Sequence, residues 1–209
     1  MLGAPMAARD FFQDAAKKRA AEAVKAVEKQ TSAEIVIAVR ERSGDYVAVD
    51  LTFGAVMALA MFAFLWFSPW SFAPALISVN VMMTFGIASL ACRQLDVLRR
   101  TLGRRRCREN AELAAKAAFV DLGISKTQGR TGILIYVSMF ERACVLVPDV
   151  GVDPKAIDGF TKAESALGAA VRSTSFEQFV SAVEALGPVL GPSLPRAEDD
   201  VNELPDEVA

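Results

Sequence analysis

Residues 51–92 read LTFGAVMALAMFAFLWFSPWSFAPALISVNVMMTFGIASLAC and contain no Asp, Glu, Lys or Arg. A helix needs about 20 apolar residues to cross ~30 Å of hydrocarbon. The stretch is therefore long enough for two membrane-spanning helices, which we expect at about 51–68 and 72–92. Ser68-Pro69 and Ala73-Pro74 bracket the turn residues Trp70 and Ser71, and proline breaks a helix. The alternative, a buried helical hairpin in a soluble protein, would need a far larger protein to cover it.

Arginines flank this stretch and are missing from its tip. Two of them, Arg40 and Arg42, precede it. Those that follow it before Glu109 are Arg93, Arg99, Arg100, Arg104, Arg105, Arg106 and Arg108. Because Lys and Arg are enriched in the cytoplasmic segments next to spans, we expect both termini in the cytoplasm. The predicted contacts with lipid at the membrane surface are Arg99, Arg100, Arg104, Arg105 and Arg106.

Polar residues inside the second predicted span are few. Ser78, Asn80 and Thr84 are predicted to make interhelical hydrogen bonds, to the first span or to a neighbouring subunit. The stretch has no ionisable side chain, which argues against an ion path and hence against a channel or transporter.

The composition excludes several kinds of chemistry. The chain of 209 residues has no histidine, so Ser-His-Asp and Cys-His catalysis are ruled out. Cys92, Cys107 and Cys144 form no CxxC pair, and they are expected to be small buried thiols rather than zinc ligands or a disulfide framework. The net charge is −2, and no aromatic residues interleave the arginines, so no nucleic-acid partner is expected.

The flanking segments alternate between helical and strand patterns. Strands are expected at 35–39, 132–138 and 142–148, and Pro148 ends the last one because it has no N–H to donate. The predicted helices are 8–30, about 94–122 with Gly123 as C-cap, one from Pro154 with Asp153 as N-cap to Arg172, and one from Ser173 or Ser175 to Gly187-Pro188.

This order predicts an α/β (α+β) sandwich with a small mixed three- to four-stranded sheet, interrupted by an inserted two-helix transmembrane hairpin. The first two strands would be parallel across a helical crossover, and the third would add antiparallel to the second. We expect residues 1–50 and 93–190 to form a single cytoplasmic domain. Residues 191–209 are predicted to be an acidic, proline-containing tail.

The segments EKQTSAEIVIAV and KAAFVDLGISKTQGRTGILIYVSMFERACVLVPDVGVD resemble the TPM domain, a family with thylakoid phosphatase-like, photosystem-repair and receptor-modulating members. The resemblance covers roughly residues 8–187 without the hairpin. Its local markers are residues 31–37 and 130–135, the pair Glu141-Arg142 and residues 149–151. The terminal VNELPDEV is similar to bacterial membrane members, so the resemblance implies the inner membrane of a bacterium. This chain departs from many members in carrying its span inside the fold.

The resemblance implies a small α/β sandwich with a membrane-associated role. For some members it implies a weak phosphatase-like activity that depends on carboxylates and a divalent cation. Asp149 and Asp153 are then the candidate ligands for Ca²⁺ or Mg²⁺, with Asp158 nearby. A hard cation such as Ca²⁺ takes six to eight oxygens, which these acids hardly supply.

Four further residues belong to the family markers or to a candidate binding surface: Arg130, Glu141, Arg142 and Gly151. Glu141 and Arg142 are interpreted first as solvated charges at a hairpin turn. In the alternative, Arg130 and Arg142 lie near the 149–153 loop and contact a partner or an anion.

Two functions follow from these patterns. The first is a membrane-anchored interaction domain without a cofactor, which binds or modulates another membrane protein. The second is a cation-dependent, phosphatase-like hydrolase using Asp149 and Asp153, with Glu141 as a further candidate.

Overall fold

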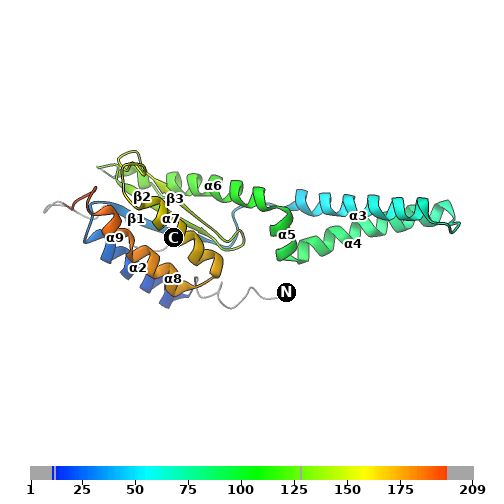
Figure 1. Cartoon of the computed structure of the whole chain (residues 1–209), viewed down its shortest axis with the longest axis horizontal. Helices are drawn as coiled ribbons and strands as arrows, with labels where there is room; N and C mark the ends of the chain where they lie inside the picture. Colours follow the sequence, from blue (N-terminus) through cyan, green and yellow to red (C-terminus); the bar gives the residue numbers. More distant parts are fainter. Residues whose placement is uncertain (1–10, 12, 128, 197–209) are drawn as a thin grey trace. The chain divides into compact units, whose positions relative to one another are not determined.

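The computed structural model describes residues 11, 13–127 and 129–196. The chain divides into two compact units (Figure 1). The first, which we call the sheet unit, holds Met1–Ser43 and Arg108–Ala209, and the second, the hairpin unit, holds Gly44–Cys107. Residues 44–50 and 93–107 therefore belong with the hairpin, although the sequence assigned them to the cytoplasmic domain.

Three strands form the sheet of the first unit, in the order β1-β2-β3. β1 (Glu34–Arg40) runs parallel to β2 (Gly132–Ser138), and β3 (Ala143–Pro148) runs antiparallel to β2. Because β1 precedes the hairpin in the chain and β2 follows it, the hairpin is inserted between two neighbouring strands. The predicted fold class, a mixed α/β sandwich with an inserted helical hairpin, is confirmed.

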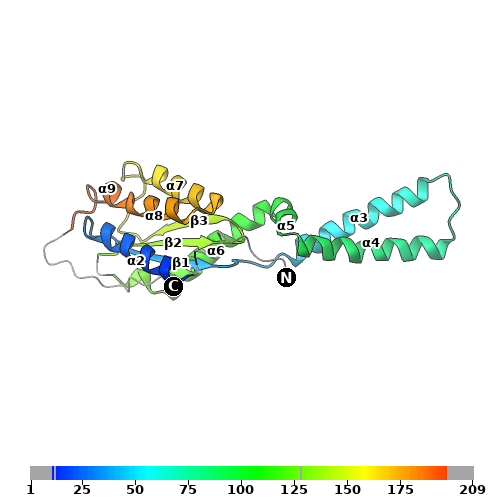
Figure 2. The same cartoon turned by 90° about the horizontal axis from the view of Figure 1, so that it is seen from below.

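Helices cover both faces of this sheet, as Figure 2 shows. One face carries α2 (Asp14–Glu28), α7 (Phe160–Ser173), α8 (Phe176–Glu184) and α9 (Leu186–Leu190). The other carries the sheet-unit part of α6 (Arg104–Asp121) and the short 3₁₀ helix η1 (Ile124–Lys126). A strand covered on both faces needs apolar side chains at successive positions, which explains the unbroken run in β1.

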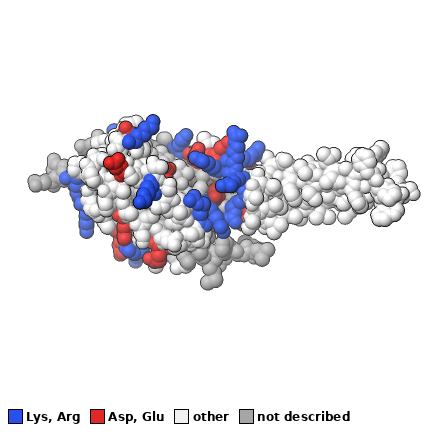
Figure 3. Space-filling view, viewed as in Figure 1, with Lys and Arg blue, Asp and Glu red and all other residues white. Residues whose placement is uncertain are grey.

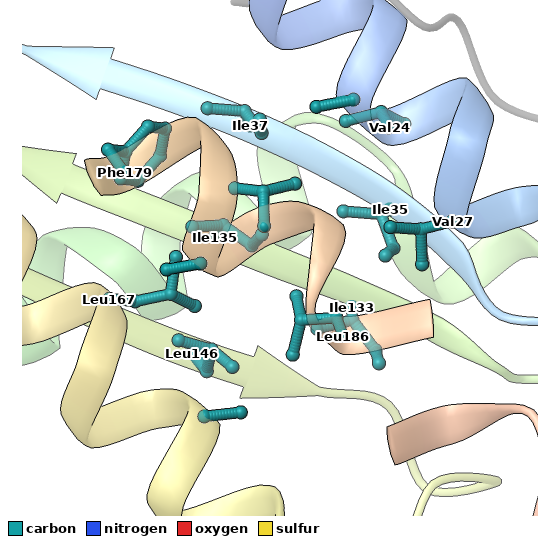
Figure 4. Close-up of a cluster of buried hydrophobic side chains, with 14 of the residues drawn as sticks. Val24, Val27, Ile35, Ile37, Ile133, Ile135, Leu146, Leu167, Phe179 and Leu186 are labelled. Atoms are coloured by element: carbon teal, nitrogen blue, oxygen red, sulfur yellow. The ribbon is translucent and has the colours of Figure 1, made fainter. Parts of the chain in front are cut away.

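The larger core lies between the sheet and the first group of helices. Ile35 and Ile37 of β1 alternate with residues that point to the opposite face, and they pack with Ile133 and Ile135 of β2 against Val24, Leu167 and Phe179 (Figure 4). Each fully buried side chain of this size contributes about 1.5–3 kcal/mol. On the other face, Val36, Ala38 and Leu134 meet Ala115 of α6.

In place of the predicted helix over 94–122, the structure has two helices, α5 (Asp96–Leu102) and α6. α4 (Pro74–Gln94) ends at Leu95, where the backbone leaves helical geometry with φ −102° and ψ 87°. α5 then runs to Gly103, and α6 begins at Arg104. Gly123, with φ 68°, follows the end of α6, as expected for a left-handed C-terminal glycine.

The third predicted helix starts later than expected. Asp153 Oδ1 accepts from the Lys155 N–H at 2.9 Å, so it stabilises a turn and is not the N-cap of a helix from Pro154. Gly159 has a φ of 85°, which no α-helix can include, and α7 begins only at Phe160.

At the fourth helix, Ser175 is the cap, since its Oγ accepts from the Gln178 N–H at 3.4 Å. The helix was expected to end near Gly187-Pro188, but α8 ends at Glu184 and a separate helix, α9, follows. Pro188 lies in the first turn of α9, where an N–H has no helical partner.

Both ends of the chain extend beyond the described residues. The predicted start of the first helix at residues 8–10 and Phe12 lies outside them, and α2 begins at Asp14. Of the predicted tail, residues 191–196 are described. Its Leu194 packs on the larger core, and the Leu194 carbonyl accepts from Thr31 Oγ1 at 2.8 Å. This part of the tail is therefore part of the fold.

The hairpin unit is built on α3 (Val47–Phe67) and α4, which pack along each other. A Cβ at Gly54 would lie 1.9 Å from Ser89 Oγ and 2.9 Å from the Phe85 carbonyl oxygen, so the two backbones approach too closely for any side chain there. Small residues at such contacts are typical of membrane helix pairs.

The outer surface of the hairpin is apolar and uncovered. Both helices are long and apolar enough to cross a membrane, with mean hydropathies of 2.0 and 1.8. Only 17% and 6% of the 18-residue apolar stretches of α3 and α4 are buried within the chain, whereas a core helix of a soluble protein would be mostly buried. Trp66 near the tip, for example, is exposed.

Three polar residues of α4, Ser78, Asn80 and Thr84, donate hydrogen bonds within their own helix. Asn80 Nδ2 donates to the Leu76 carbonyl at 2.8 Å, and Thr84 Oγ1 donates to the Asn80 carbonyl at 2.8 Å. Ser78 Oγ donates in the same way to the Pro74 carbonyl at 3.2 Å. The prediction of a hydrogen bond to the first span is therefore wrong for these donors, and a bond to a neighbouring subunit stays a prediction.

Candidate functional sites

The first candidate site joins the start of β2 to the end of β3. Arg130 donates two hydrogen bonds to the Asp149 carboxylate, from Nε to Oδ2 at 2.8 Å and from Nη2 to Oδ1 at 3.0 Å. The Val150 N–H also donates to Asp149 Oδ1 at 2.7 Å. Asp149 is only 4% exposed, so its charge is compensated by this bidentate pair and by the backbone donor.

Gly151 closes the same turn. Its N–H donates to the Arg130 carbonyl at 2.9 Å, and a Cβ there would lie 2.5 Å from that oxygen and 2.6 Å from the Gly129 carbonyl oxygen. The three motif residues Arg130, Asp149 and Gly151 are thus brought together. They form a rigid base that holds Val150, 82% exposed, at the surface.

The predicted metal site finds no support in this arrangement. A cation at Asp149 would compete with the positive Arg130 and with the Val150 N–H, and Asp153 accepts from the Lys155 backbone. Among the residues that the structure describes, no group of three or more His, Cys, Asp or Glu side chains could hold a metal ion.

The second candidate site is a buried polar cluster at the opposite end of β2. Glu141 Oε1 accepts from the Ser43 N–H at 3.0 Å, and Glu141 Oε2 accepts a short hydrogen bond from Ser138 Oγ. Ser43 Oγ donates to Ser138 Oγ at 2.6 Å and lies 2.9 Å from Tyr136 Oη. Because the Ser43 proton goes to Ser138, Tyr136 must donate to Ser43. The hydroxyls therefore form a chain that ends on the carboxylate.

The interpretation of Glu141 as a solvated turn charge is wrong, since Glu141 is only 9% exposed. The reason is that pairing continues past the strands. Met139 N–H donates to the Arg40 carbonyl at 3.0 Å and Phe140 N–H to the Glu41 carbonyl at 2.8 Å, which carries Glu141 beneath Ser43. Sequence patterns showed no link between these segments, so Ser43, Tyr136 and Ser138 were missed.

Arg142 does not join Arg130. It follows the C-terminal end of β2, while Arg130 precedes the N-terminal end, and a strand rises about 3.3 Å per residue. The two arginines are therefore separated by the length of β2, and the hypothesis that both border the 149–153 loop is wrong. Both have positive φ, 52° for Arg130 and 50° for Arg142, as residues in tight turns often do.

The buried cluster holds the chain rather than exposing a reactive group. The Ser43 and Ser138 hydroxyls bond to each other, to Tyr136 and to Glu141, and the sequence contains no histidine that could activate them. Ser43 is the last residue of the sheet unit before the hairpin unit begins. The cluster thus fixes the point at which the chain leaves the sheet unit.

The third candidate site is the base of the hairpin, where Arg99 and Asp50 form a buried ion pair. Arg99 Nε donates to Asp50 Oδ1 at 2.8 Å and Arg99 Nη2 to Asp50 Oδ2 at 2.6 Å, and both residues are 4% exposed. The Arg99 guanidinium also lies 5.7 Å from the Tyr46 ring centroid. The prediction of a lipid contact is therefore wrong for Arg99. Asp50 was missed because α3 begins at Val47, inside the segment assigned to the domain.

The other predicted lipid contacts have a different environment. Arg104, Arg105 and Arg106 are exposed and Arg100 is half-buried. Figure 3 shows that the length of the hairpin is free of charged side chains on the face displayed, and that Lys and Arg gather at its base.

The three thiols are not paired with one another. Cys92 and Cys107 are buried, and Cys144 of β3 is half-buried. Burial, and secondarily the charge of Glu164, raises the pKa of Cys144 from 9.0 to about 12, against the lowering effect of Arg172. This thiol is therefore protonated and unreactive at neutral pH.

Comparisons with known proteins bear on the fold. No protein-family profile and no curated protein matches the sequence. Among solved structures, the chain is similar to the NMR structure of the BA42 protein from the psychrophilic bacterium Bizionia argentinensis. The TM-score is 0.57 and the sequence identity 18%, over 94% of this chain and 93% of that chain. At this identity the likeness is one of fold.

Proposed function

We propose that this chain is a membrane-anchored, TPM-like domain that binds or modulates another membrane protein. The observation that carries the proposal is the uncovered apolar surface of α3 and α4. Each helix has 21 residues, enough to cross a bilayer, and little of either is buried within the chain. Exposing this apolar surface to water costs free energy, whereas in a bilayer the same surface contacts lipid acyl chains and the cost is absent.

The location follows from the arginines and the family resemblance. We place the hairpin in the inner membrane of a bacterium, with both termini in the cytoplasm and the tip outside. A reporter fused after Ala209 should report cytoplasm, and a cysteine replacing Ser71 should be labelled by an impermeant reagent from outside. The opposite pattern would reverse the orientation.

Binding is favoured over catalysis by the state of the candidate residues. The Asp149 carboxylate is occupied by Arg130, and Glu141 is occupied by Ser43 and Ser138. These acids stabilise turns, and one turn presents the exposed Val150 on a rigid base. Calorimetric titration with Ca²⁺ and Mg²⁺ is expected to give no saturating heat. A saturable signal would favour the phosphatase-like hydrolase instead.

The test of the binding function is a comparison of two tagged proteins in bacterial membranes. One is the full chain, and the other is the hairpin unit Gly44–Cys107 alone, which should insert but lacks the sheet unit. After crosslinking and purification, a membrane protein should be enriched by the full chain only. Identical sets of captured proteins would contradict the proposal, because the sheet unit would then add no partner.

A further inference from the structure

We propose that α5 and the arginines on either side of it dock on the headgroups of anionic phospholipids, so that α5 lies in the membrane interface. The inference rests on the proposed insertion of α3 and α4 into a bilayer. It adds the class of lipid that the base of the hairpin binds and the element that binds it.

The first observation is the exposure of apolar side chains on α5 and at its start. Leu95 is 52%, Val97 68% and Leu102 52% exposed, although α5 is a separate element from the two long helices. The break at Leu95 turns α5 across the direction of α4 (Figure 1). A short helix that lies across the end of a membrane hairpin and exposes leucine and valine fits the headgroup–acyl boundary.

The second observation is the charge that surrounds this helix. Arg93 precedes it, and Arg104, Arg105 and Arg106 follow it, all exposed. Asp96 is the one acid between residues 93 and 106. Apolar side chains flanked by arginines are complementary to an anionic leaflet, in which acyl chains lie beneath phosphate groups.

The third observation explains how α5 is held. Arg99 reaches back to Asp50 of α3, and the bidentate pair removes both charges from the surface. The ion pair therefore fixes α5 to the first turn of α3, and the arginines beyond it carry the exposed positive charge.

The experiment uses the full chain reconstituted in liposomes and tryptophan quenching by brominated acyl chains. The probe is Val97→Trp in a Trp66→Phe, Trp70→Phe background, and the matched control is Val150→Trp in the same background. Val97 and Val150 are both exposed valines, one on α5 and one on the sheet unit. Liposomes contain brominated phosphatidylcholine alone or mixed with phosphatidylglycerol.

Quenching of the Val97→Trp protein should increase when phosphatidylglycerol is present, and the Val150→Trp protein should show no such increase. Replacing Arg104, Arg105 and Arg106 by Gln should remove the increase. Replacing Lys17, Lys18 and Lys29 by Gln removes the same charge from exposed positions on and next to α2 and should leave the increase intact.

An unchanged Val97→Trp signal, an equal response of Val150→Trp, or an increase that survives the Arg→Gln changes would overturn the inference. The native Trp66 and Trp70 test insertion separately. If they are quenched while α5 shows no anionic-lipid response, the anchor stands and only the docking fails. If they are not quenched, the proposed membrane insertion itself fails.

Discussion

At the scale of single residues, two buried acids, Glu141 and Asp149, accept hydrogen bonds that hold turns of the backbone. Glu141 accepts from the Ser43 N–H and Ser138 Oγ, and Asp149 accepts from Arg130 and the Val150 N–H. Both carboxylates are buried and both stabilise turns at the ends of β2. A buried acceptor of this kind matters mainly through the donors that it satisfies.

Replacing Glu141 by Ala should destabilise the sheet unit by about 2–3 kcal/mol, because the Ser43 N–H and the Ser138 hydroxyl would lose a charged acceptor. Amide hydrogen exchange at Ser43 and Met139 should accelerate accordingly. The matched control is Glu112→Ala, which removes only the exposed pair with Arg108 and should change exchange little. Equal effects of the two changes would contradict a structural role for the cluster.

The raised pKa of Cys144 predicts that the free energy of unfolding depends on pH in the alkaline range. Its pKa in the folded chain is about 12, above the ordinary 9.0, so the unfolded chain loses this proton first. The contribution of Cys144 to the free energy of unfolding should fall as pH rises from about 9 to about 12. The measurement is the difference between the wild-type protein and Cys144→Ala in urea unfolding across this range. A difference that does not vary with pH would show that the thiol is not held protonated by the fold.

At the scale of elements, backbone breaks divide the apolar and basic segment between residues 74 and 121. Periodicity alone predicts a continuous helix over 94–122, but Leu95 leaves helical geometry and Gly103 separates α5 from α6. A Cβ at Gly103 would lie 2.9 Å from the Arg99 carbonyl oxygen and 3.3 Å from Val49 Cγ2. Gly103 therefore lies where Arg99 and Val49 approach too closely for a larger residue.

The packing of α3 on α4 can be tested with a pair of glycines. Gly54→Leu should separate the two helices, because a Cβ there meets Ser89 Oγ at 1.9 Å. Gly86→Leu, on α4, should leave them in place, because nothing lies within 4 Å of its added Cβ. Distances between spin labels on α3 and α4 in liposomes give the readout. An unchanged distance for Gly54→Leu would contradict the close contact.

At the scale of the whole molecule, an apolar hairpin is inserted between two parallel neighbouring strands. Both hydrophobic cores of the sheet unit are made from residues outside Gly44–Cys107. The free energy that holds the sheet together thus comes from contacts within the sheet unit, and the inserted segment contributes none of these core side chains.

We therefore expect the sheet unit to fold without its anchor. Replacing Gly44–Cys107 by a long flexible Gly-Ser linker should yield a soluble protein that unfolds cooperatively and keeps the protected amides of β1 and β2. Circular dichroism and hydrogen exchange provide the check. A collapsed product without protected amides would show that the hairpin is required for the sheet to form.

Local patterns were sufficient for the hairpin, the three strands and the fold class. Charge-free length indicated the hairpin, apolar runs indicated β1 and β2, and Gly123 indicated the end of α6. These signals are read correctly because each depends on residues close together in the chain. The start of α7 was missed because the backbone at Gly159, with φ 85°, overrides the signal of Asp153-Pro154.

The uncharged helical hairpin and the small α/β sandwich around it can be recognised from the order of residues alone. Only the tertiary structure decided the partners of its charged and polar side chains: Arg130 with Asp149, Arg99 with Asp50, and Glu141 with Ser43. The physical reason is that hydrophobic periodicity is a local property. The satisfaction of a buried charge, in contrast, depends on donors that folding brings from distant parts of the chain.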